Sequence, residues 1–138
     1  MINKVTLIGR LGGDPELKAL ESGVFVGRFS LATSDPYKDK DGNWQDRTDW
    51  HNVVLWRDQA ERASKILKKG ELCFVEGKVS YRKYTDKDGQ ERTATDIVAN
   101  TFRRLDKREA QEAEFNTNDT TWPGKDEPLI TNPDQLPF

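Results

Sequence analysis

The segment 48–56, Thr-Asp-Trp-His-Asn-Val-Val-Leu-Trp, constrains the fold of this chain more than any other. Its β-branched and aromatic residues are typical of a strand. Side chains alternate between the two faces of a strand, so one face is expected to carry Trp50, Asn52, Val54 and Trp56. The opposite face then carries His51, Val53 and Leu55. A hydrophobic core needs only one of these faces. The two indoles therefore suggest a surface on which nucleic-acid bases stack, with burial in a core or a subunit interface as the alternative.

The rest of the chain predicts four more strands and one helix. The strands are expected over 2–10, 24–33, 72–85 and 93–105, with a polar loop over 34–46. A helix is predicted over 58–69, with Asp58 as its N-cap and Gly70 at its end. Its apolar face would consist of Ala60, Ala63, Ile66 and Leu67. An all-β chain of five strands, with one helix between strands three and four, has the order of an OB-fold Greek-key barrel. Other small β-barrels remain an alternative.

Charge is divided unevenly along the chain. Of the 22 Lys and Arg residues only Lys125 lies beyond residue 108, whereas seven of the 24 acids do. Residues 1–108 therefore have a net charge of about +4 and residues 109–138 one of about −6, an asymmetry that often accompanies nucleic-acid binding. We interpret 1–108 as one folded domain and 109–138 as a disordered acidic tail.

The tail ends in Asn-Pro-Asp-Gln-Leu-Pro-Phe. Apolar residues reappear there after a polar stretch, which suggests a peptide that docks on a partner protein. The candidate docking residues are Asp134, Leu136, Pro137 and Phe138. An end without function is the alternative.

The single cysteine, Cys73, lies in an apolar run and is expected to be a small buried residue. One cysteine forms no intramolecular disulfide and no multi-cysteine zinc site. The sequence shows neither a signal-peptide pattern nor a membrane-length apolar run, so we expect a soluble protein of the cytoplasm.

Residues 37–42 and 84–89 form a near-repeat, Tyr-Lys-Asp-Lys-Asp-Gly and Tyr-Thr-Asp-Lys-Asp-Gly. The glycine position does not fit a calcium loop, so each copy is interpreted as a hairpin turn. His51 has no cysteine partner nearby, and the sequence has neither a nucleophile motif nor a phosphate-binding glycine loop. We therefore predict a protein that is not an enzyme and needs neither metal nor cofactor.

Basic residues are interleaved with aromatic ones over 78–92 and end the predicted helix. Cations beside flat rings hold single strands without reading their sequence. The candidate phosphate contacts are Lys69, Arg82, Lys83 and Arg92.

The chain resembles the bacterial single-stranded DNA-binding proteins of the homotetrameric OB-fold type. The resemblance runs in order from residue 1 to about 106 and includes the last residues. It is carried by 3–5, 7–9, 11–12, 14–16, 31–34, 48–51, 53–55, 60–61, 67–70, 75–77, 81–86 and 89–92. It implies single-strand binding in replication, recombination and repair, a nucleoid-associated location, and recruitment of replication and repair proteins through the tip.

The family's stacking positions correspond to Tyr37, Trp50, Trp56 and Tyr84. His51 matches a position at the subunit contacts. Trp44 has no counterpart, so packing within its loop and contact with DNA both remain open. The rival function is an OB-fold assembly or adaptor module whose aromatic face binds protein.

Overall fold

The computed structural model describes residues 1–107, and the predicted tail with its docking residues lies outside them. The described residues form eight strands and one helix: β1 (Val5–Leu11), β2 (Glu16–Ala19), β3 (Phe25–Ser34), β4 (Tyr37–Lys38), β5 (Trp44–Gln45), β6 (Thr48–Trp56), α1 (Asp58–Ile66), β7 (Leu72–Thr85) and β8 (Glu91–Arg104). The five long strands are the five that the sequence predicts. The two remaining features are the short strand β2 and the β4–β5 hairpin, which occupies the predicted polar loop.

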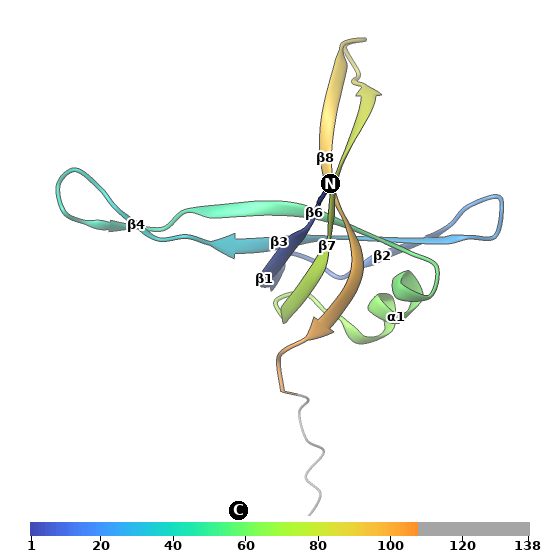
Figure 1. Cartoon of the computed structure of the whole chain (residues 1–138), viewed down its shortest axis with the longest axis horizontal. Helices are drawn as coiled ribbons and strands as arrows, with labels where there is room; N and C mark the ends of the chain where they lie inside the picture. The colour runs from blue at the N-terminus through green and yellow to red at the C-terminus, as the bar shows by residue number, and fades with distance from the viewer. Residues whose placement is uncertain (108–138) are drawn as a thin grey trace, which may run out of the picture. The chain divides into compact units, whose positions relative to one another are not determined.

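The long strands close into a barrel in the order β1-β7-β8-β6-β3, and β3 pairs again with β1. β6 and β8 run parallel, while the other pairs of long strands are antiparallel. This is the predicted Greek-key barrel with its helix between the third and fourth long strands (Figure 1). The prediction of an OB-fold is confirmed.

Two glycines allow the barrel to close. Gly9 lies where β1 leaves β7 for β3, and a Cβ there would lie 2.2 Å from the Ala32 carbonyl oxygen. Gly77 lies at a β-bulge against β8, and its Cβ would lie 2.0 Å from the Val98 carbonyl oxygen. Both contacts are with backbone, which cannot swing aside, so any larger residue would force the strands apart.

The barrel interior is apolar and includes Phe29, Leu31, Val53, Leu55, Val75 and Phe102. Cys73 is also fully buried, and burial raises the pKa of its thiol to about 11. The cysteine therefore stays protonated near neutral pH and packs as a small apolar residue, as predicted.

Helix α1 is shorter than predicted, and its N-cap differs. The cap is Arg57, which has a positive φ of 55° and makes no side-chain cap hydrogen bond. Instead its amide donates to the Phe25 carbonyl at 2.8 Å, so pairing with β3 decides where the helix begins. Asp58 is the first helical residue, and its carboxylate lies in the first turn, where it favours the helix dipole. Ala60 and Ala63 are fully buried, as the predicted apolar face requires.

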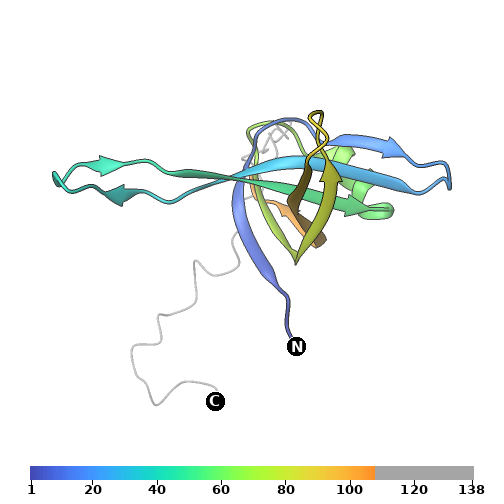
Figure 2. The same cartoon turned by 90° about the horizontal axis from the view of Figure 1, so that it is seen from above.

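Three hairpins project from the barrel in different directions (Figures 1 and 2). One is the β2–β3 turn, the second is the β4–β5 extension of β3 and β6, and the third is the outer half of β7 and β8. The aromatic residues predicted to stack on DNA are distributed over the barrel and the last two of these hairpins.

Candidate nucleic-acid interface

The indoles lie on the face of β6 that alternation predicts, although Val54 on the same face is only 4% exposed. Val53 and Leu55 are fully buried in the barrel, whereas Trp50 and Trp56 on the opposite face are 63% and 45% exposed. An interior role for these indoles is therefore excluded within the described residues. We call the outer face of β6, with the β3 residues beside it, the platform.

Register with β3 defines the neighbours of each indole. Trp50 lies opposite Ala32 and Trp56 lies opposite Val26, both small or medium apolar residues. Between them, Ser30 lies opposite Asn52 and Arg28 opposite Val54. The platform therefore has an indole at each end, with polar and cationic groups in the middle.

A glycine supports the Trp50 ring. A Cβ on Gly12, in the turn after β1, would lie 2.5 Å from Cζ3 of Trp50 and 2.6 Å from the Ser30 hydroxyl. The ring edge thus lies against bare backbone, which limits how far the indole moves toward the barrel. Sequence reasoning missed this contact, because the turn and the strand are far apart in the chain.

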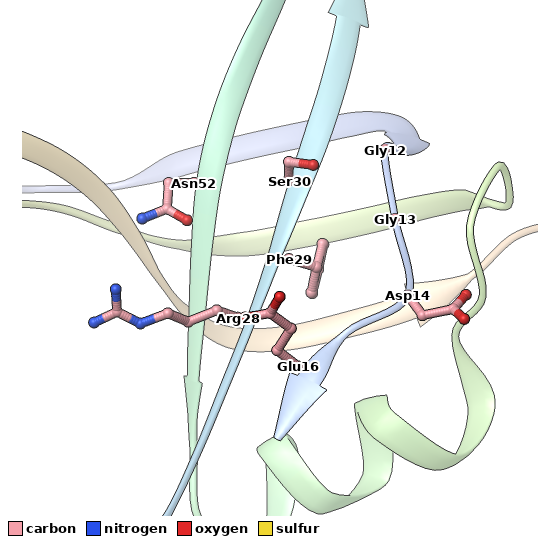
Figure 3. Close-up of a pocket in the computed structure, with 8 residues that line it drawn as sticks. All are labelled: Gly12, Gly13, Asp14, Glu16, Arg28, Phe29, Ser30 and Asn52. Carbon is pink, nitrogen blue, oxygen red and sulfur yellow. The ribbon is translucent and has the colours of Figure 1, made fainter. Parts of the chain in front are cut away.

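A hollow of about 270 Å³ lies between the turn after β1 and the middle of the platform. It is lined by residues of the turn after β1 and of the platform: Gly12, Gly13, Asp14, Glu16, Arg28, Phe29, Ser30 and Asn52. In Figure 3 the Arg28 side chain is extended, with its guanidinium directed away from Asp14. Arg28 forms no ion pair with any other described residue, so its charge is available to a phosphate. The sequence analysis did not assign Arg28 to the site, although its even spacing from Ser30 along β3 was a usable signal.

A buried carboxylate fixes the middle of the platform. Asp96 on β8 is only 6% exposed, accepts a hydrogen bond from Asn52 Nδ2 at 2.6 Å and pairs with Arg82 Nε at 2.7 Å. This bridge joins β6, β7 and β8 at one point. It also orients Arg82, whose guanidinium carbon lies 5.7 Å from the Tyr84 ring centroid.

The four predicted phosphate contacts differ in how free their charges are. Arg82 pairs with Asp96, Arg92 Nε pairs with Asp86 at 2.9 Å, and Lys83 Nζ lies 3.8 Å from Glu91. Lys69 forms no ion pair among residues 1–107. An arginine that engages only Nε keeps its other N–H donors, so each pair still leaves donors for a phosphate.

The two near-repeats form hairpin tips with the same hydrogen bonds. In the first, Asp39 Oδ1 accepts from the amides of Asp41 and Asn43, and Oδ2 accepts from Gln45. In the second, Asp86 Oδ1 accepts from the amides of Asp88 and Gln90, and Oδ2 accepts from Arg92. Gly42 and Gly89 have φ of 79° and 77° at equivalent places. Each aspartate thus holds a turn, as the hairpin interpretation predicts, and the described residues contain no cluster of three or more potential metal ligands.

Tyr37 and Tyr84 lie just before these tips. Tyr37 is on β4 and is 51% exposed, and Tyr84 is on β7 and is 45% exposed. Tyr84 lines a second hollow with Lys83, Thr85, Gly89 and Glu91. The structure does not gather the four predicted stacking residues into one pocket. It displays two on the platform and one on each of two hairpins.

His51 lies on the barrel side of β6, away from the indoles, as alternation predicts. Its Nε2 is 2.8 Å from the Thr33 hydroxyl, and the residue is half-buried. Among residues 1–107, no helix has the length and apolar character to span a membrane.

An OB-fold barrel with exposed aromatic rings and cations on its outer face defines a class of protein suited to extended, anionic, ring-bearing ligands. The family comparison is more specific. Residues 2–105 match the model of the single-strand binding protein family, and the chain belongs to that family.

Named relatives agree with this assignment. The single-stranded DNA-binding protein of Neisseria meningitidis serogroup A is 51% identical over 104 residues, which cover 75% of this chain and 60% of the relative. The single-stranded DNA-binding protein of Xylella fastidiosa is 47% identical over 104 residues, which cover 63% of that relative. The chain therefore spans less than two thirds of the length of these relatives. Single-stranded DNA-binding protein 1 of Chlorobaculum tepidum is 39% identical over 138 residues, covering 95% of this chain and 85% of the relative.

A solved structure, the Plasmodium falciparum SSB complex with ssDNA, has the same fold. It superposes with a TM-score of 0.71 at 32% identity, covering 77% of this chain and 97% of the other. The same fold is thus found in a chain solved together with single-stranded DNA.

Proposed function

We propose that this protein binds single-stranded DNA without strong sequence preference and protects it during replication, recombination and repair. The observation that carries the proposal is the exposure of Trp50 and Trp56 on the outer face of a closed barrel. The chain is polar, with a mean hydropathy of −0.87. Its exposed indoles offer flat apolar faces on which bases stack in water. Duplex DNA, whose bases are already stacked, is a poor ligand for such a surface.

Bases stack on four rings: the two platform indoles and the phenol rings of Tyr37 and Tyr84. Lys69, Arg82, Lys83 and Arg92 supply contacts with phosphates, as argued from the sequence. The ion pairs of three of these residues do not oppose the assignment, because N–H donors and positive charge remain at each site. The binding needs no metal or cofactor, and the protein is not an enzyme.

The experiment is a titration with oligothymidylate while tryptophan fluorescence is recorded. Stacking quenches indole emission, whereas an adaptor module that binds protein gives no response. Trp50→Ala and Trp56→Ala should each weaken binding by about 1–3 kcal/mol, the range for one base–aromatic stack. Because both rings are exposed, the thermal midpoint should change little in either variant. Unchanged affinity in both variants would remove the platform from the binding site.

Beyond the DNA contact, the proposal includes a homotetramer of the cytoplasm, associated with the nucleoid. Support comes from the family resemblance and from the position of His51 on the face away from the indoles. Sedimentation equilibrium of the wild type and His51→Ala tests this assignment, which predicts a tetramer that the substitution weakens.

The proposed partner-docking tip consists of Asp134, Leu136, Pro137 and Phe138, outside the described residues. Phe138 fits an apolar pocket while the terminal carboxylate meets a basic residue, a known mode of capturing chain ends. Deletion of residues 132–138 should abolish recruitment of replication and repair proteins and leave DNA affinity equal or slightly higher. A truncated protein that recovers the same partners in a pull-down would overturn this role.

A further inference from the structure

Trp44 has no role in the sites described so far, yet it is the most exposed of the three described indoles. It lies on β5 and is 72% exposed, so it does not pack within its loop. A large apolar ring held in water at the end of a projecting hairpin has no stabilising role in the barrel. One exposed ring alone carries no meaning, but exposed rings that gather on one surface mark a place where a ligand binds.

One register continues unbroken from the platform to this hairpin. Val26 lies opposite Trp56, and the pairs proceed one by one to Ser34 opposite Thr48. Beyond them the Asp35 amide donates to the Arg47 carbonyl, and Lys38 lies opposite Trp44. Each of these pairs has the same sum of residue numbers, so the connecting segment contains no bulge.

An unbroken register preserves side-chain alternation. Trp44, Trp50 and Trp56 are separated by six residues each, an even number, so the ribbon of β3–β4 and β5–β6 carries all three on the same side of its backbone. Tyr37, opposite Gln45, has the other parity. Trp44 and Tyr37 lie in adjacent cross-strand pairs, so their side chains lie on opposite faces of the hairpin.

A cation accompanies Trp44. Lys38 is its direct cross-strand partner and therefore shares its face. Lys38 forms no ion pair within the described part of the chain. A ring for a base beside an ammonium group for a phosphate is the same combination that the platform presents with Trp50, Trp56 and Arg28.

We propose that Trp44 and Lys38 extend the single-strand path from the platform along the β4–β5 hairpin. The inference rests on the proposed function. At roughly 3.3 Å per residue, the path from Trp56 to Trp50 is about 20 Å and that from Trp56 to Trp44 about 40 Å. At about 3.4 Å per stacked nucleotide, these spans correspond to roughly 6 and 12 nucleotides, and fewer when the strand is stretched.

The direct test isolates the Trp44 signal. The chain has four tryptophans, so the variant Trp50→Phe, Trp56→Phe, Trp122→Phe retains Trp44 alone and keeps a ring at both platform positions. Saturation with oligothymidylate should quench its emission, while a labelled oligonucleotide reports binding independently. A matched variant that retains only Trp50 provides the reference quench. Binding without any change in Trp44 emission would overturn the inference.

The second test uses length. Trp44→Ala should weaken binding of an oligothymidylate of about 20 nucleotides severalfold and leave one of about 6 nucleotides unchanged, and Trp44→Phe should restore most of the loss. If Trp44→Ala and wild type bind oligonucleotides of every length equally well, the path along the hairpin is wrong, while the proposed function is unaffected. Failure of the wild type to bind any oligonucleotide would instead contradict the proposed function.

Discussion

At the scale of single residues, small groups decide where the large ones lie. The Trp50 indole occupies its place because Gly12 offers no side chain at 2.5 Å from its ring. The Asp96 carboxylate, nearly buried, holds Asn52 and Arg82 with short hydrogen bonds and so keeps the middle of the platform polar and ordered. Neither residue needs to touch DNA to determine what the platform presents.

Gly12→Ala should therefore weaken single-strand binding while leaving the barrel folded. The added methyl group displaces the exposed Trp50 ring, which is a flexible side chain, rather than backbone. The loss should not exceed that of Trp50→Ala, about 1–3 kcal/mol. Fluorescence titration measures the affinity, and circular dichroism checks the fold.

Gly13→Ala is the matched control, because a Cβ there has no atom within 4 Å and the backbone φ is not positive. If both alanine variants bind as the wild type does, Gly12 does not position the indole.

At the scale of elements, two hairpin tips from different parts of the chain are held by the same pattern of hydrogen bonds. Asp39 and Asp86 each accept two backbone amides and one side chain from the same relative positions. These donors favour the carboxylate form. The pKa of Asp39 is lowered mainly by the Asn43 amide and that of Asp86 mainly by the Arg92 side chain. Tyr37 and Tyr84 each lie two residues before the aspartate of a tip.

The lowered pKa values predict a pH dependence of the tips. A carboxyl group whose pKa is lower in the folded state stabilises the fold above its unfolded pKa, near 3.8, and that stabilisation is lost as the pH falls through the folded value. Hydrogen exchange at the Asp88 and Gln90 amides should therefore be protected at pH 5 and above, after correction for intrinsic exchange, and should lose protection below pH 3.8.

Asp86→Asn tests the same hairpin at neutral pH. The amide keeps an acceptor but loses the charge, so protection of Asp88 and Gln90 should fall even at pH 7. Asp88→Asn is the matched control in the same tip, with protection read at Gln90. The described residues form no hydrogen bond with the Asp88 carboxylate, whereas its amide donates to Asp86. Identical protection in Asp86→Asn and wild type would show that the charge does not hold the turn.

At the scale of the whole molecule, the described residues combine a closed barrel with aromatic rings and cations on its outside. Closure satisfies the strand edges internally, so hairpins can project without destabilising the core. Three cations near the rings, Arg82, Lys83 and Arg92, have carboxylate partners. Such pairing reduces repulsion on the surface when no DNA is bound. Arg28, Lys38 and Lys69 are among the cations that form no ion pair within residues 1–107.

Binding should weaken as salt rises, because each phosphate contact releases counterions. Lys69→Ala should reduce the slope of log affinity against log salt by about 0.7, the value per phosphate on single strands. Lys83→Ala and Arg92→Ala should act in the same direction. Titrations at several salt concentrations measure the slopes, and a slope unchanged in all three variants would place the DNA path elsewhere.

Arg82 behaves differently within the same series. Its substitution by Ala leaves the buried Asp96 carboxylate without its cation, so a lower thermal midpoint should accompany the loss of affinity. Lys69, which has no such partner, is therefore the cleaner probe of phosphate contact. A melting curve for each variant separates the two effects.

The sequence alone predicted the elements whose pattern is local. Alternation over 48–56 separated the Trp50 face from the Val53 face, and the run over 72–85 matched β7 to the residue. Turn chemistry identified both Asp-Gly hairpins. These features follow from side-chain periodicity and backbone freedom, which neighbouring residues determine.

Tertiary structure decided what depends on distant backbone. The start of α1 at Arg57 is set by a hydrogen bond to Phe25, and β2 exists because Glu16–Ala19 pairs with β3. The contact of Gly12 with Trp50, the bridge from Asp96 to Asn52 and Arg82, and the common face of Trp44 with the platform join residues that local patterns cannot relate. Their positions follow only from closing the barrel, which sets the register of β3 and β6 and carries it outward into the hairpin.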